Sequence, residues 1–352
     1  MKKILAGYFY RLIRGFEIWA LLVLLVVASL YITKVEFDVD LITFSEGDYF
    51  SSLDVSPKDA YRCYTERLPD DVFARITNSE CYDDINTLFI LFCGIHNVSA
   101  ILILIFIPLF FGRLYSDGTI KNLIACGHSK TKIYIASLIM TFLIDLIMLI
   151  AGVVTIAVMC RINNWFPPVY LPVVLFMLLV ELFVLFTVSA LSMAVLFASA
   201  KRIVSLIAGF IIGVLVFLPL SSFAVLLLMN NFTEDYLESA AYEEYITIMH
   251  EKGPNALEER FLLSEFDIAV SYEGRDLDIS APYNLSPVEK NILIATIYID
   301  PFFIAHFGNS IGVSPYMMAR DGLMAVNIAC DAFWITLSTS IGLIIFRRRE
   351  MA

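Results

Sequence analysis

Residues 110–134, FFGRLYSDGTIKNLIACGHSKTKIY, separate two long apolar runs and concentrate turn-forming, helix-capping and basic side chains. Asp117 is a strong candidate for a helix N-cap, with Ser116 as a second candidate. Gly127 suits the left-handed conformation that commonly ends a helix. Residues 119–126 are therefore predicted to form a helix of about two turns. Because so short a helix is marginally stable in water, we expect it to pack against the membrane face or a partner protein.

The predicted short helix has two different faces. Ile120, Leu123 and Ile124 are spaced i, i+3, i+4 and form an apolar face. Lys121 is expected toward the opposite, polar face. Gly118, just before the helix, leaves room for a close backbone approach or an unusual turn.

The composition places the chain among membrane proteins. Of its 352 residues, 59% are hydrophobic, and the mean hydropathy is +0.78. Both values lie well above those of soluble globular proteins. Runs of apolar residues long enough to cross a bilayer occur at residues 16–33, 85–111, 133–159, 169–199, 203–229 and 323–346. We therefore predict an all-α integral membrane protein with six transmembrane helices.

Basic residues cluster before the first run, between the second and third, between the fourth and fifth, and after the sixth. With six spans, all four clusters fall on one side of the membrane. The positive-inside rule makes that side cytoplasmic, so both termini are expected in the cytoplasm. Residues 34–84 and 230–322, in which acidic residues far outnumber basic ones, would then be two acidic extracellular regions.

The predicted organisation has five parts. Residues 1–33 combine an N-terminal helix with the first span, and residues 1–15 have the mixture of basic and regularly spaced apolar residues typical of an amphipathic helix in the membrane interface. An ordinary basic flank of a signal anchor is the alternative. The other parts are the loop 34–84, spans two to five with a cytoplasmic coupling loop (85–229, loop 112–132), the outer region 230–322, and the last span with its basic tail (323–352).

The outer regions carry two further predictions. Cys63 and Cys81 can form a disulfide outside the membrane, and two unpaired cysteines are an equally good interpretation. In the second region, residues 232–266 are predicted to be helical and residues 267–287 rich in loops. Residues 291–305 are apolar but too short to span, which favours a re-entrant or interfacial segment.

Three acidic residues lie inside predicted spans: Asp145, Glu181 and Asp331. A charge in the bilayer interior is costly, so each should face protein or water. They could line a polar translocation path or relay protons, or they could bond to Ser, Thr or Asn side chains of neighbouring helices. His96 and Asn97, in the second span, allow the same two interpretations, and Asn97 fits a helix–helix contact better than a substrate ligand.

The sequence lacks the patterns that carry common enzymatic chemistry. It contains no GxxxxGK[ST] phosphate-binding loop, and its cysteines and histidines show no metal-ligand spacing. We therefore predict no catalytic residue, no metal, no cofactor and no nucleic-acid partner.

The segment YSDGTIKNLIACGHSKTKIYIASLI, residues 115–139, resembles the cytoplasmic loop between the second and third spans of ABC-2 type transporter permeases. The tail IGLIIFRRREMA, a last span closed by Phe and basic residues, is also similar to the C-terminus of that family. The positions that match the loop pattern of the family are Asp117, Gly118, Thr119, Ile120, Ser129, Lys130 and Tyr134.

The resemblance implies a membrane subunit of a bacterial exporter in the plasma membrane, paired with a second copy or a related permease. A separate ATPase would hydrolyse ATP and dock on the short coupling helix. A peptide, drug or lipid-like compound would be exported, and immunity to an antimicrobial peptide is one such role. The docking residues implied are Asp117, Gly118, Thr119, Ile120, Lys121, Leu123 and Ile124.

Two other classes of function remain open. A proton- or ion-coupled secondary transporter would use the acidic residues in the spans. A membrane sensor would bind a ligand through its acidic extracellular regions. An ATPase gene beside this one would favour the exporter.

Overall fold

The computed structural model describes residues 1–43, 80–164, 171–211, 241, 243–245, 247–248, 257–262, 267–277, 286–299 and 323–349. Within these residues, five helices are long and apolar enough to cross a membrane. They are α2 (Phe16–Thr43), α5 (Glu80–Ser116), α7 (Lys130–Ile162), α8 (Leu171–Ser199) and α15 (Leu323–Arg348). Five of the six predicted spans are thereby confirmed by length and composition, which makes this a multi-pass membrane protein.

The predicted fifth span, 203–229, is described only at its start. The helix α9 (Arg202–Phe210) follows α8 after a short turn in which Ala200 has a φ of 49°. The remainder of this predicted span lies outside the described residues.

The helix α8 lies at the centre of the bundle. It contacts α15, α5, α7 and α9, while α5 also packs against α2 and α7. The outward faces of the long helices carry large exposed apolar side chains, as expected of surfaces that meet lipid. On α2 and α7 these include Val23, Leu24, Val27, Ile150, Val154 and Val158.

The first helix, α1 (Lys2–Arg14), packs one side against the bundle. Ile4, Tyr8 and Leu12 are buried at i, i+4, i+8 spacing, and α1 contacts both α7 and α2. The Tyr8 hydroxyl lies 3.4 Å from the Ser137 hydroxyl on α7. Gly15 ends α1 with an extended backbone, so the chain changes direction before α2 begins.

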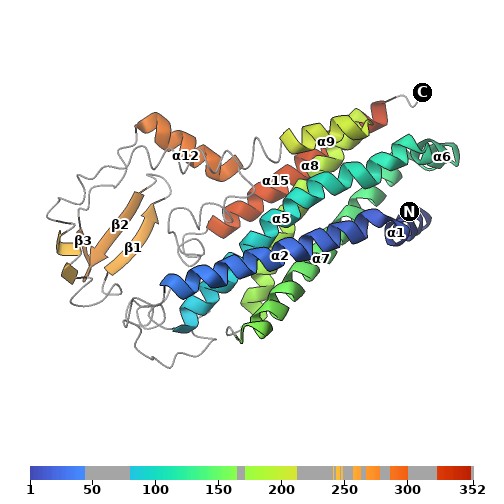
Figure 1. Ribbon diagram of the computed structural model, residues 1–352. Coiled ribbons are helices and arrows are strands. Elements are labelled where there is room, and N and C mark those ends of the chain that lie inside the picture. Colours follow the sequence, from blue (N-terminus) through green and yellow to red (C-terminus); the bar gives the residue numbers. More distant parts are fainter. Residues whose placement is uncertain are drawn as a thin grey trace.

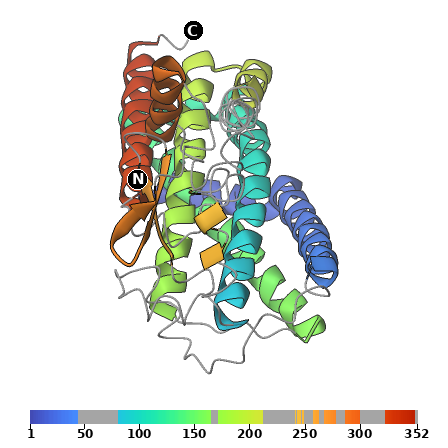
Figure 2. The same ribbon diagram turned by 90° about the vertical axis from the view of Figure 1, so that its left-hand side faces the viewer.

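Figure 1 shows α1, the short helix α6 (Thr119–Ala125) and the end of α15 at one end of the bundle, and the strands at the other. Figure 2, viewed from the strand end, places the strands in front and α1 behind. The four basic clusters therefore gather at one end of the bundle. They lie before α2, between α5 and α7, between α8 and α9, and after α15. This agrees with the predicted same-side arrangement.

The described residues are predominantly helical, as predicted, and residues 257–262 and 267–277 add a small antiparallel sheet that the prediction did not include. Strands β1 (Leu257–Leu262), β2 (Asp267–Tyr272) and β3 (Arg275–Leu277) pair in the order β1-β2-β3. The prediction of a helix over residues 232–266 is wrong at β1. The prediction of a loop-rich stretch over residues 267–287 is wrong at β2 and β3. The β2–β3 turn has positive φ at Glu273 and Gly274, which matches the right-handed twist of a two-residue hairpin.

The predicted re-entrant segment, 291–305, overlaps the helix α12 (Pro287–Ile299). Ser286 and Glu289 form a capping box, because the Glu289 carboxylate accepts from the Ser286 backbone N–H at 2.8 Å. The helix contacts α15 and buries Leu293. Residues 300–305 lie outside the described residues, and re-entry into the membrane stays a prediction.

Gly342 allows α15 to approach α8 closely. A Cβ atom there would lie 2.8 Å from the Ala194 Cα atom and would overlap the Tyr134 hydroxyl. We expect Gly342→Ala to lower the free energy of unfolding by about 1–3 kcal/mol, as overpacked cores do. Thermal unfolding in detergent measures this loss.

Gly7 is the matched control, since a Cβ on this helical glycine meets no atom within 4 Å. Gly7→Ala should be neutral or should stabilise by up to about 1 kcal/mol. Equal destabilisation by both substitutions would contradict the close packing assigned to Gly342.

Candidate functional site

The candidate site is the turn–helix–turn between α5 and α7, which contains α6. Gly118 precedes α6 with a φ of 70°, and its carbonyl accepts the first helical hydrogen bond, from the Asn122 N–H, at 2.9 Å. A Cβ on Gly118 would meet no atom within 4 Å. Of the two reasons predicted for this glycine, the unusual turn is seen in the structure, whereas no described residue of this chain approaches its backbone closely.

Asp117 does not cap α6, which corrects the prediction. Its own N–H donates to the Arg113 carbonyl at 2.9 Å, so Asp117 closes the last turn of α5. Its carboxylate faces Arg113 at 3.6 Å, in the i, i+4 position of the same helix. The left-handed Gly118 stands between Asp117 and the N–H groups of α6, and no side chain caps α6. Ser116, the second candidate, donates instead to the Arg113 carbonyl at 2.9 Å.

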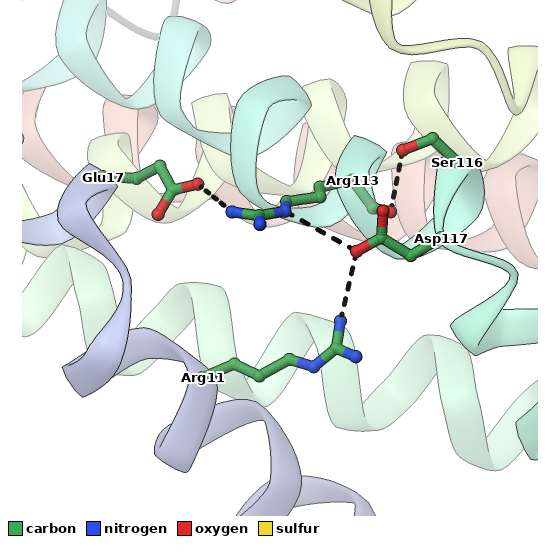
Figure 3. Close-up of polar contacts among 5 residues, drawn as sticks. All are labelled: Arg11, Glu17, Arg113, Ser116 and Asp117. Carbon is green, nitrogen blue, oxygen red and sulfur yellow. Dashed lines mark hydrogen bonds and ion pairs between the residues drawn. The ribbon is translucent and has the colours of Figure 1, made fainter.

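Asp117 belongs to a charge network that ties the N-terminal helices to the end of α5 (Figure 3). Arg11 of α1 lies 3.8 Å from the Asp117 carboxylate. Arg113 donates to Glu17, in the first turn of α2, at 3.0 Å. These side chains are partly exposed, so each pair contributes at most about 1 kcal/mol and is weakened by salt. The network therefore orients the turn more than it stabilises the protein.

At its C-terminal end, α6 is stopped by Gly127, as predicted, and this glycine has a φ of 84°. The His128 N–H donates to the Leu123 carbonyl at 3.1 Å and the Gly127 N–H to the Ile124 carbonyl at 2.9 Å. This pair of bonds is the Schellman motif. Ser129 then caps α7, its hydroxyl accepting from the Lys132 N–H at 3.3 Å. Backbone bonds thus hold α6 at both ends.

The apolar face of α6 packs on the protein itself. Ile120 is 1% exposed, and Leu123 and Ile124 are partly buried against the same core. Thr119 is partly buried. The residues of α6 and its C-cap that point outward are Lys121, Asn122, Ala125 and Cys126. The outward surface of α6 therefore combines two polar side chains with two small ones, and we refer to these four residues as the α6 outer face.

A cluster of aromatic rings supports this end of the bundle. Phe197 of α8 contacts Tyr115 of α5, Tyr134 of α7 and Phe346 of α15, with ring centroids 5.5, 4.9 and 4.7 Å apart. Each ring comes from a different helix. Movement of one helix end is therefore resisted by the other three.

The end of α15 is tied to its neighbours by basic side chains. The Lys130 ammonium donates to the Arg347 carbonyl at 3.2 Å and also to the Arg349 carbonyl. The Arg349 guanidinium donates to the Ala198 carbonyl at 2.6 Å. These donors satisfy carbonyls that a helix C-terminus leaves open.

The intramembrane acidic residues lie around α8 rather than in one cluster. Ser189 donates to the Asp145 carboxylate at 2.8 Å, joining α8 to α7. Thr187 donates to the Asp331 carboxylate at 3.1 Å, joining α8 to α15, and Asn327 donates to the same carboxylate at 3.0 Å. These bonds agree with the interpretation that the acidic residues bond to polar side chains of neighbouring helices. Among the described residues, no three acidic, His or Cys side chains gather as metal ligands would.

The remaining candidates are only partly placed. Glu181 is buried on α8. His96 and Asn97 lie on α5, and their side chains lie outside the described part of the structure. Cys63 also lies outside it, and Cys81 is described only as a backbone position of α5. The disulfide stays a prediction.

Comparison with known proteins found no matching family model, no matching curated protein and no matching solved structure.

The two roles considered for Asp117 predict different effects of Asp117→Asn. Asn caps a helix as well as Asp does, so a capping role would leave stability unchanged. The charge network instead predicts a loss of up to about 1 kcal/mol that disappears at high salt. Thermal unfolding at low and at molar salt measures both. Stability equal to wild type at low salt would contradict the network.

Proposed function

We propose that this chain is the membrane-spanning subunit of an ABC-2 type exporter. One observation supports this best: a seven-residue helix between two spans is fixed by its apolar face and exposes its other face. Because the apolar face packs on the chain itself, the α6 outer face is left available to a partner. The partner proposed is a separate ATPase, which would hydrolyse the ATP.

The proposed mechanism follows from how α6 is connected. Gly118 and the Schellman turn join α6 to α5 and α7 through backbone hydrogen bonds. A force that an ATPase applies to α6 would therefore reach both spans. The aromatic cluster would pass it to α8 and α15. Closure of two ATPases on two permease copies, or on a permease and its paralogue, would switch the pathway between inward- and outward-facing states.

The basic end of the bundle is the cytoplasmic end in this proposal, with both termini in the cytoplasm of a bacterial cell. The sheet and the acidic outer regions would then be extracellular. The substrate would be a peptide, a drug or a lipid-like compound, and protection against an antimicrobial peptide is one such role.

The α6 outer face provides the test. We expect Lys121→Glu combined with Ala125→Trp to reduce co-purification of the partner ATPase about tenfold or more, since a reversed charge and a bulky ring placed near the centre of an interface can together cost more than about 1.4 kcal/mol of binding free energy. Both residues are exposed, so the permease should still fold. Substitution of Ile120 would be a poor test, because this buried side chain supports the permease itself.

Lys132→Glu is the matched control, an exposed lysine at the same end but on α7. Cys126 adds a direct measurement, because it is exposed and should be shielded from maleimide when the ATPase is bound. Normal ATPase recovery with the α6 double variant, together with unprotected Cys126, would refute the docking role.

The secondary-transport alternative predicts that the carboxylates themselves act. Asp145→Asn and Asp331→Asn retain an oxygen that accepts the hydroxyl bonds from α8 but lose the charge. If these residues only join helices, each variant should lose less than about 2 kcal/mol of stability and should still bind the ATPase. The alternative would be favoured if the well-folded variants no longer transported the substrate and if transport by the unmodified chain required no ATPase.

A further inference from the structure

The helix α1 has three distinct faces, each repeating at helical spacing. The first, Ile4, Tyr8 and Leu12, is buried against the bundle. The second is apolar and points outward: Phe9 and Ile13 are 49% and 50% exposed. The third is basic and also points outward. Its members are Lys3, Tyr10 and Arg14, and we refer to them as the α1 basic face.

The outward apolar face of α1 continues onto the membrane-facing surface of α2. Phe16 is 80% exposed and Trp19 56% exposed. The Trp19 indole donates to the Ile13 carbonyl at 3.0 Å, which fixes the corner between α1 and α2. Tryptophan favours the boundary between the lipid tails and water. These residues therefore mark the bilayer surface along one side of α1, next to the basic face.

The charges of the α1 basic face are not neutralised by the protein. Within the described residues, Lys3 and Arg14 form no ion pair. Arg11 differs, since it is paired with Asp117 on another side of the helix. The Arg14 guanidinium lies 4.8 Å from the centroid of the Tyr10 ring, a cation–π contact that holds it on the outer side.

We propose that the α1 basic face binds the headgroups of anionic phospholipids. The apolar face fixes the depth of α1 at the bilayer surface, and this depth brings two unpaired cations, Lys3 and Arg14, to the level of the lipid phosphates. Basic residues near an anionic membrane surface each strengthen binding. The proposal depends on the chain spanning a membrane and not on the identity of any ATPase.

Trp19 is the natural probe, because it lies at the corner beside this face. With Trp165→Phe and Trp334→Phe, the full chain keeps Trp19 as its one tryptophan. We would reconstitute it in bilayers that mix phosphatidylcholine with phosphatidylglycerol, one lipid at a time carrying bromine. The quenching ratio gives the relative association constant of the two lipids beside α1. We expect a preference for phosphatidylglycerol of roughly fivefold or more.

The paired change Lys3→Gln and Arg14→Gln should bring this ratio close to one. The matched control, Lys132→Gln with Lys201→Gln, removes two exposed cations at the same end but off α1, and should keep the preference. Lys3→Gln alone should give an intermediate ratio and serves if the double variant does not fold. Inorganic phosphate at constant ionic strength should leave the preference unchanged, because the binding partner is a lipid.

The proposal would be overturned if the two brominated lipids quenched Trp19 fluorescence equally in the chain that carries only the two tryptophan substitutions. So would a double variant that retains the preference, or a control pair that loses it. Loss of the preference on adding free phosphate would show an anion site that does not depend on the membrane, which also contradicts the proposal.

Discussion

Two glycines in the left-handed backbone conformation, Gly118 and Gly127, fix the orientation of the only short helix between α5 and α7. Residues with a Cβ atom lose about 1–2 kcal/mol in this conformation, so these positions favour glycine. Because both turns are held by backbone hydrogen bonds, α6 cannot rotate independently of the spans that flank it. Its buried Ile120 and its outward Lys121 follow from that constraint.

The same end of the bundle joins several parts of the chain by different kinds of contact. Aromatic rings join α5, α7, α8 and α15 through Phe197. Ion pairs join α1 and α2 to the end of α5. The ring contacts are insensitive to salt, whereas the exposed ion pairs are screened by it. Salt therefore weakens the polar link between α1 and α5, while the buried side chains of α1 keep it packed on the bundle.

Within the membrane, polar contacts converge on α8. Its Thr187 and Ser189 bond to acidic residues of the two helices beside it. Association of helices in lipid lacks the hydrophobic driving force available in water, so packing and hydrogen bonds specify which helices pair. Close approach at Gly342 and these side-chain bonds together account for the central place of α8.

The sequence by itself determined the features that depend on near neighbours or on composition. Five spans, the grouping of basic clusters at one end, the amphipathic α1 and the stop at Gly127 were all predicted, because run length, charge and backbone preference are local properties. A hairpin signal was present too, because the Glu273–Gly274 turn lies beside alternating apolar residues of β2, but the prediction assigned residues 267–287 to a loop-rich stretch.

Only the tertiary structure decided what Asp117 and Ile120 contact. A carboxylate before a short helix normally caps it, and periodicity shows that Ile120 lies on an apolar face without showing what covers it. Arg11 lies far from Asp117 in the sequence, and the core that buries Ile120 is built from several spans. Such contacts depend on how helices pack together, which local sequence does not specify.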